Sequence, residues 1–241
     1  MLTRIRPCAA FALARRDLPT PLDVINVITT ARFDRYQWYG LLVMPVMAAV
    51  GGHVRWMGRF ERSLHGERQA DKLLIVRYPS QRRFLAMTLN PYYLAINPLR
   101  EAGVRRFEAS FTHPSHDDPA LHSRRLLVAV HFNSADAGAL AAVRELIEPA
   151  AGELVYATRA VADLSIVASA RETDPNPLSF QQLALFAPAG GELPEHDLDS
   201  LAAKVATVTD GCSVQVYRRE PRSAYRPSLR RPAMAGAAAA G

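Results

Sequence analysis

The first 113 residues alternate between short β-branched segments and longer segments with helical periodicity. Residues 23–30 (DVINVITT) form a short β-branched run, which predicts a strand. Residues 33–50 place apolar side chains at helical spacing before Gly51-Gly52, which predicts a helix that Pro45 kinks or restarts. Further strands are expected over 53–60, 72–78 and 104–111, and helical segments from residue 81 to Gly103 with a break near Pro91. The order β-α-β-β-α-β predicts a ferredoxin-like unit.

The same order of elements returns in the second half of the chain. Residues 164–170 are either a bent continuation of the strand expected over residues 153–160 or an extra strand. An antiparallel sheet with helices on one face leaves its other apolar face to be covered. We therefore predict an α+β fold in which tandem ferredoxin-like (βαββαβ) units, with antiparallel sheets, form an α/β barrel. In this half, strands are expected over 125–132, 153–160, 180–187 and 212–218, and helices over 135–151 and 198–208.

This pattern divides the chain into five segments. A polar, proline-containing stretch separates the two units, and the C-terminal end is alanine-rich and of low complexity. The resulting plan is an N-terminal extension (1–19), a first ferredoxin-like α/β-barrel domain (20–113), a linker (114–124), a second ferredoxin-like domain (125–220) and a basic, Ala-rich disordered tail (221–241).

Positive charge is concentrated near the C-terminal end. Lys and Arg outnumber Asp and Glu by 29 to 23, which gives a net charge of +6, and residues 218–231 hold six arginines and one glutamate. The rest of the chain is therefore close to neutral, which argues against nucleic acid as a partner. We expect the tail to be solvated and disordered, and a contact with phosphate or a membrane surface is the alternative.

Targeting and membrane signals are weak. The apolar run over residues 8–14 is short for a secretory signal and lacks a convincing cleavage site. Residues 41–50 are apolar but fall well short of the roughly 20 residues that span a bilayer. Two cysteines, Cys8 and Cys212, are too few for a disulfide framework. The sequence predicts a cytoplasmic protein without a membrane partner.

One stretch of the first half resembles a known family. Residues 72–93 (KLLIVRYPSQRRFLAMTLNPYY) combine a strand, Arg-aromatic-x-Ser, a helix with Phe-Leu-x-Met, and Pro-x-Tyr, and residues 51–56 (GGHVRW) lead from a helix end into a strand. Over residues 20–113 the chain resembles an uncharacterised domain-of-unknown-function family of the dimeric α/β-barrel superfamily. That superfamily contains antibiotic-biosynthesis-type monooxygenases, muconolactone isomerases, stress-response barrels and haem-binding chlorite-dismutase-like proteins. The resemblance implies a fold and carries over no catalytic residue.

His53 and Arg55 are the candidate catalytic residues. Residues two apart in a strand share a face. If that face lines a cavity between sheet and helices, His53 would act as acid or base and Arg55 would hold a carboxylate or enolate. Trp38 and Tyr78 would be substrate-binding walls of the same pocket. The alternative is that the pair faces solvent and Trp56 points inward.

His131, at the end of a strand, is a further substrate-binding candidate. Tyr156 and Arg159 follow on the next strand of the predicted sheet. The alternative is a histidine that is satisfied or half-exposed at a strand end.

Metal and cofactor signals do not converge on a site. The histidines and aspartates of residues 113–122 are of types that bind zinc or copper, but they lie in a proline-containing loop and are expected to be solvated. A haem site would need a proximal histidine, for which the second half offers His131 and His196 without a matching motif. Phosphate-binding loops, dinucleotide fingerprints and serine-hydrolase elbows are missing. We expect neither a metal nor a cofactor.

These observations leave two main hypotheses for function. The first is a protein that binds a small apolar or aromatic ligand, and acts as a cofactor-free monooxygenase or isomerase of an aromatic or polyketide-like substrate. The alternative is a non-enzymatic structural or partner-binding barrel, and a haem-binding chlorite-dismutase-like protein is a weaker one. The chain is expected to be a pseudo-dimeric monomer or a homodimer.

Overall fold

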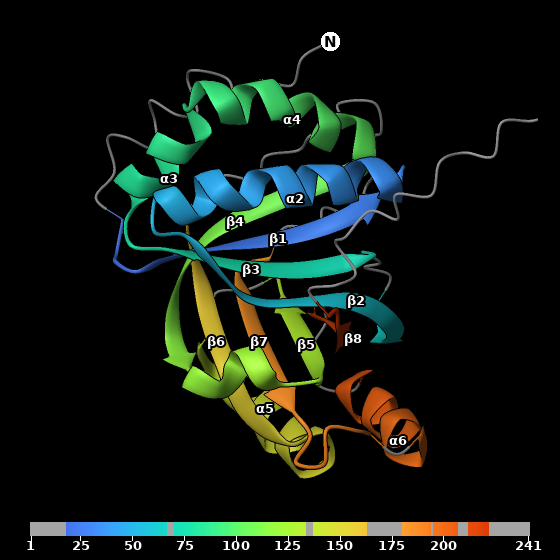
Figure 1. Ribbon diagram of the computed structural model, residues 1–241. Helices are drawn as coiled ribbons and strands as arrows, with labels where there is room; N and C mark the ends of the chain where they lie inside the picture. Colours follow the sequence, from blue (N-terminus) through green and yellow to red (C-terminus); the bar gives the residue numbers. More distant parts are fainter. Residues whose placement is uncertain are drawn as a thin grey trace, which may run out of the picture.

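Eight antiparallel strands close into a barrel in the computed structural model (Figure 1). The structure describes residues 18–66, 70–133, 137–162, 180–193, 195–206 and 212–221, so most of the N-terminal extension, the segment 164–170 and nearly all of the tail lie outside it. The strands are β1 (Leu22–Thr30), β2 (His53–His65), β3 (Lys72–Tyr78), β4 (Val104–Asp117), β5 (Leu126–Phe132), β6 (Glu153–Ala162), β7 (Gln182–Ala187) and β8 (Cys212–Arg219). The helices are α2 (Phe33–Ala49), α3 (Gln81–Thr88), α4 (Pro91–Gly103), α5 (Ala137–Ala151) and α6 (Glu195–Ala206), with a short 3-10 helix η1 (Pro119–Ser123).

Both halves of the barrel have the same strand order. The strands follow one another around the barrel as β1-β3-β2-β8-β5-β7-β6-β4. The first half therefore reads β4-β1-β3-β2 and the second β8-β5-β7-β6, which is the arrangement of a βαββαβ unit in each case. The edge pairs β2–β8 and β4–β6 join the halves and leave no free edge. The predicted α+β fold with a closed antiparallel barrel is confirmed.

β4 is longer than the sequence pattern predicts. It continues past Phe111 to Asp117 and pairs with β6 over this part. The sequence pattern assigns the last residues of β4 to the linker over 114–124. They form a strand instead because the edges of two sheets meet here, so the backbone groups of β4 and β6 can hydrogen-bond to each other. Pro114 is accommodated beside an irregular step of the ladder.

Apolar side chains form three layers around the barrel wall. In β1, Ile25 and Val27 point into the barrel and join a cluster that contains Trp56, while Val24 and Ile28 point outward. Helices α2, α3 and α4 cover the outer face of the first half, and α5 and α6 cover that of the second (Figure 1).

The end of α2 brings the helix close to β3. The helix runs through Pro45 without interruption, so the predicted restart does not occur. It is followed by Gly51, which has a φ of +78° that favours glycine. At the next residue, Gly52, a Cβ atom would stand 2.8 Å from Cε1 of Tyr78. Glycine therefore lets the Tyr78 ring pack under the helix end.

A group of charged side chains ties the strands of the two halves together. Asp23 of β1 is fully buried and accepts hydrogen bonds from Nε and Nη2 of Arg77 at 2.7 and 2.8 Å. Arg77 also bonds Oδ2 of Asp117 at 2.6 Å, and Arg55 bonds the other oxygen of that carboxylate. The hydroxyl of Tyr156, from β6, donates to Oδ2 of Asp23 at 2.7 Å. The hydrogen bonds to Asp23 raise the pKa of Arg77, which stays charged.

Candidate functional site

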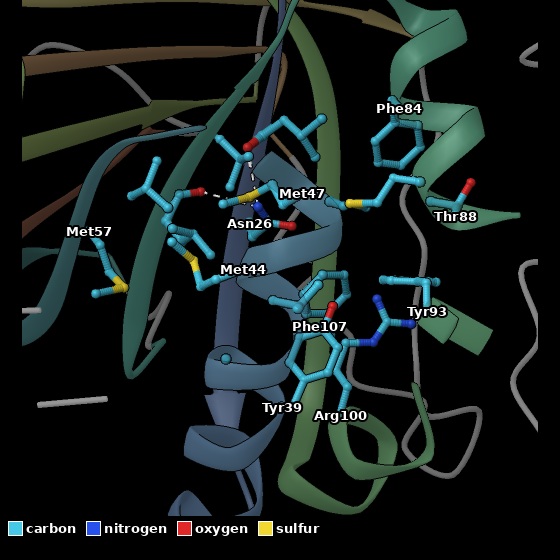
Figure 2. A pocket seen from close by; sticks show the side chains of 18 of the residues that line it. Asn26, Tyr39, Met44, Met47, Met57, Phe84, Thr88, Tyr93, Arg100 and Phe107 are labelled. Carbon is cyan, nitrogen blue, oxygen red and sulfur yellow. Dashed lines mark hydrogen bonds between the residues drawn. The ribbon is translucent and has the colours of Figure 1, made fainter. Parts of the chain in front are cut away.

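A cavity of about 280 Å³ lies between α2, α3, α4 and the outer face of the first half of the barrel (Figure 2). Its volume is near the low end of the range for small-molecule pockets. Leu41 and Met44 of α2 line it and are each 42% exposed, so its rim reaches the surface. Most of the lining is apolar, sulfur-containing or aromatic: Val24, Val43, Met47, Val54, Met57, Leu74, Val76, Tyr78, Phe84, Met87, Phe107 and Ala109.

Two helices bring tyrosines to this cavity. Tyr36 and Tyr39 lie on the buried face of α2, and Tyr93 lies on the buried face of α4. The two helices pack closely because α4 ends in Gly103, where a Cβ atom would stand 2.6 Å from the backbone nitrogen of Tyr36. The rings of Tyr39 and Tyr93 meet edge to face, with their centroids 6.5 Å apart.

Arg100 of α4 is the one charged residue among the described residues that line the cavity. It is only 4% exposed, and its guanidinium carbon lies 4.6 Å from the centroid of the Phe107 ring and 6.0 Å from that of Tyr39. No carboxylate within the described residues forms an ion pair with it, and its Nε has no hydrogen-bond partner there. Glu101, next to it in the chain, accepts a hydrogen bond from Asn97 and attracts Arg100 without forming an ion pair with it.

The buried tyrosines act as neutral hydrogen-bond donors. Burial raises the pKa of Tyr36, of Tyr39 and of Tyr78 well above the ordinary tyrosine value. The Tyr78 hydroxyl already donates to the Met87 sulfur at 3.2 Å. At neutral pH the cavity therefore combines one fixed positive charge with uncharged phenols.

The residues that the sequence singles out are not gathered in one pocket. Tyr78 lines the cavity. His53 and Trp38 are exposed, and neither is part of its lining. Arg55 is bound to Asp117. His131 is fully buried on β5, in the second half of the chain, and the centroid of its ring lies 5.5 Å from the centroid of the Phe180 ring.

A strand irregularity explains why the His53/Arg55 argument does not place that pair in the cavity. The pairing of β2 with β3 shifts register between Val54 and Trp56. Because of this shift Val54 packs on the helix side while Trp56 points into the barrel. The rule that residues two apart share a face does not hold across such a step.

The acidic residues near the predicted linker are held by arginines. Asp117 is bound by Arg55 and Arg77, and Asp118 is bound by Arg124 at 2.7 Å. The hydrogen bond from Arg124 lowers the pKa of Asp118. In the described part of the chain no group of histidine, cysteine and acidic residues is arranged to hold a metal ion. The cavity lining that the structure describes contains no histidine either, so it does not fit a haem with a histidine ligand.

The sequence analysis misses the two polar residues that stand out in the cavity, Arg100 and Asn26. Arg100 follows Tyr93 and Ile96 by seven and four residues, so it shares their buried helix face. Asn26 interrupts a β-branched strand in which asparagine is disfavoured. Both signals are visible in the sequence as polar residues at apolar positions.

Comparison with known proteins identifies a family for part of the chain. Residues 24–108 match the family described as Domain of unknown function (DUF1330). The predicted resemblance of residues 20–113 to an uncharacterised domain family is therefore confirmed. No curated protein matches the chain.

Solved structures similar to this chain include a protein of unknown function and others described as a candidate monooxygenase or as oxidase-like. A protein of unknown function from Rhodopseudomonas palustris is 27% identical over 42% of this chain and 88% of its own, with a TM-score of 0.40. A candidate monooxygenase from Lactobacillus acidophilus is 13% identical over 83% and 94%, with a TM-score of 0.45. An anthrone oxidase-like protein is 10% identical over 84% and 92%, with a TM-score of 0.43.

None of the helices in the described part of the chain is long and apolar enough to cross a bilayer.

Proposed function

We propose that the protein binds a small apolar molecule with one anionic group in the cavity under α2, α3 and α4. The observation that carries the proposal is the buried Arg100, which has no carboxylate partner among the described residues. A buried charge is unfavourable unless it is paired. A carboxylate or enolate of a ligand supplies the missing partner through charge-assisted hydrogen bonds.

The rest of the cavity selects an apolar body for this ligand. Met44, Met47, Met57 and Met87 line it, and methionine side chains adapt to irregular apolar shapes. The aromatic rings of Phe84 and the tyrosines favour a flat or aromatic ligand. The small volume limits the ligand to about the size of one or two fused rings.

Ligand binding alone does not make the protein an enzyme, because catalysis needs further groups. Arg100 and the neutral tyrosines are suited to stabilise an enolate, as the expected cofactor-free oxygenase or isomerase of an aromatic or polyketide-like substrate would need. Proton abstraction also requires a base, and the described lining contributes no carboxylate or imidazole. Binding of an apolar anion is therefore the function that the geometry supports best.

Calorimetric titration with 2-naphthoate at neutral pH tests the proposal. The wild-type protein is expected to bind it, and Arg100→Met to bind it roughly tenfold to a hundredfold more weakly, because a hydrogen bond to a charged group is worth about 1.5–3 kcal/mol. Arg82→Met, which removes an exposed arginine of α3 outside the lining, is the matched control and should bind like the wild type. Equal affinity in wild type and Arg100→Met, or no binding by either, contradicts the proposal.

A further inference from the structure

Asn26 is a second buried polar group that faces the cavity. It lies in the middle of β1 and is 6% exposed. Its Nδ2 donates hydrogen bonds to the carbonyl oxygens of Val24 at 3.2 Å and Leu74 at 3.3 Å. Because both neighbours are acceptors, the amide nitrogen must face them and Oδ1 must point the other way. Figure 2 shows this oxygen on the side opposite the two hydrogen bonds.

The carbonyl oxygen of this side chain has no donor within the described residues. Asn26 only donates in the hydrogen bonds that it forms there. Its neighbours on the same face of β1 are Val24 and Ile28, which are both buried in the apolar layer under the helices. This oxygen is not among the fully enclosed side-chain atoms that lack a partner, so it is accessible from the cavity that Asn26 lines. A valine would suit the apolar surroundings of this strand better than an asparagine. An acceptor kept at this position is suited to a donor that arrives with a ligand.

Asn26 and Arg100 occupy separate positions of the same cavity. Asn26 pairs with Ala109 of β4, and Ile28 pairs with Phe107, so Asn26 and Phe107 are diagonal neighbours on one face of the sheet. Cβ atoms in such positions are about 7–8 Å apart or slightly closer. The guanidinium of Arg100 lies over Phe107. A ligand that contacts both groups must therefore carry its hydroxyl away from its carboxylate.

We infer that the cavity takes a hydroxyaryl carboxylate, with the carboxylate on Arg100 and a distal hydroxyl donating to Oδ1 of Asn26. This inference rests on the proposed function and deepens it by naming the ligand class and the residue that accepts the hydrogen bond of the ligand's hydroxyl. A site built to hydrogen-bond a hydroxyl discriminates against the analogue that lacks it, because its own polar group is then left unpaired.

Three naphthoates in calorimetric titrations test the inference on the wild-type protein. The hydroxyl of 6-hydroxy-2-naphthoate lies at the far end of the ring system, and it is expected to bind about fivefold to tenfold more tightly than 2-naphthoate. Its 6-methoxy analogue, which accepts but cannot donate, should lose this gain. The isomer 3-hydroxy-2-naphthoate, whose hydroxyl lies beside the carboxylate, should bind no better than the parent. A 6-hydroxy compound that binds no more tightly than 2-naphthoate overturns the inference, and is the result expected if a water molecule occupies the acceptor.

Variants of Asn26 assign the gain to this residue. In Asn26→Leu the ratio of the affinities for the 6-hydroxy compound and for 2-naphthoate should fall to about one, whatever the change in the affinity for 2-naphthoate itself. If this variant does not fold, Asn26→Val replaces it, because valine suits the strand and has no acceptor. A preference that persists in the folded variant refutes the role of Asn26. Arg100-dependent binding of 2-naphthoate without any hydroxyl preference would overturn this inference alone and leave the proposed function standing.

Discussion

The guanidinium of Arg100 stacks over the ring of Phe107, with 4.6 Å between the guanidinium carbon and the ring centroid. This contact between α4 and β4 is a cation–π interaction in a largely desolvated place, where such contacts are worth about 2 kcal/mol. It offsets part of the cost of burying a charge without a carboxylate. The arginine can therefore remain charged in the cavity without a carboxylate partner among the described residues.

Arg100 should reduce the stability of the ligand-free protein. Arg100→Met keeps an apolar side chain of similar length and removes the unpaired charge, so the free energy of unfolding is expected to rise by about 1 kcal/mol. Arg100→Ala also removes the packing on Phe107 and should be less stable than Arg100→Met by about 2 kcal/mol. Urea unfolding of the three proteins measures both differences. A loss of more than about 2 kcal/mol in Arg100→Met, which is more than the contact with Phe107 explains, would mean that a further partner for the charge exists within the fold.

The ion pairs of Arg77 should be important for stability, unlike those at the surface. Arg77→Met leaves the fully buried Asp23 with the hydrogen bond from Tyr156 but without its charged partner, which is expected to lower the free energy of unfolding by about 3 kcal/mol. Arg218→Met is the matched control, since it breaks an ion pair to Glu61 whose side chains are 53% and 38% exposed, and should cost less than about 1 kcal/mol. Chemical denaturation compares the two variants, and similar losses in both would contradict this ranking.

Gly58 has no room for a side chain because the Trp56 ring covers it. A Cβ atom at this position would collide with Cη2 of Trp56. Gly58→Ala is therefore expected to destabilise the protein by about 2 kcal/mol, as overpacking does, and to alter the fluorescence of the buried Trp56. Gly190→Ala provides the comparison, since a Cβ atom there meets nothing within 4 Å. Equal stability of the two variants would show that the tryptophan ring moves aside without cost.

Stability should fall at alkaline pH through the buried tyrosines. Burial raises the pKa of Tyr36, Tyr39, Tyr78 and Tyr156 above their value of about 10 in the unfolded chain. These tyrosines therefore contribute their full stabilisation below about pH 10. That stabilisation is lost as the pH rises from about 10 toward the pKa values of the tyrosines in the folded protein.

Ultraviolet titration of tyrosinate, followed together with circular dichroism, measures this behaviour. These four tyrosines are expected to ionise only when the protein unfolds. Reversible ionisation of all tyrosines near pH 10 in the folded protein would contradict the burial of the cavity phenols.

Much of the architecture could be predicted because local patterns and sheet geometry point the same way. The β-branched run over β1 predicts a strand, and the glycines after α2 predict where that helix ends. The closure of the barrel through β4 and β6 could not be read locally, since it depends on two sheet edges that are distant in the sequence. The pairing explains why β4 extends to Asp117 and into the predicted linker.

The site was harder to predict than the fold. The argument for His53 and Arg55 assumed regular alternation, and the register shift beside Trp56 removes that premise. Arg100 looks like an ordinary last-turn arginine that interacts with its helix end. Its spacing from Tyr93 and Ile96 marks it as a polar residue on a buried helix face, but a cavity beside its charge becomes apparent only from the packing of α4 against Phe107.

The ratio of two affinities tests the central claim most directly. 2-Naphthoate and 2-acetylnaphthalene have nearly the same shape, but only the first is an anion. The wild-type protein is expected to prefer the anion by at least about tenfold, and Arg100→Met to show no such preference. Equal binding of the two compounds by the wild-type protein would contradict the assignment of Arg100 as the anion-binding residue of the cavity.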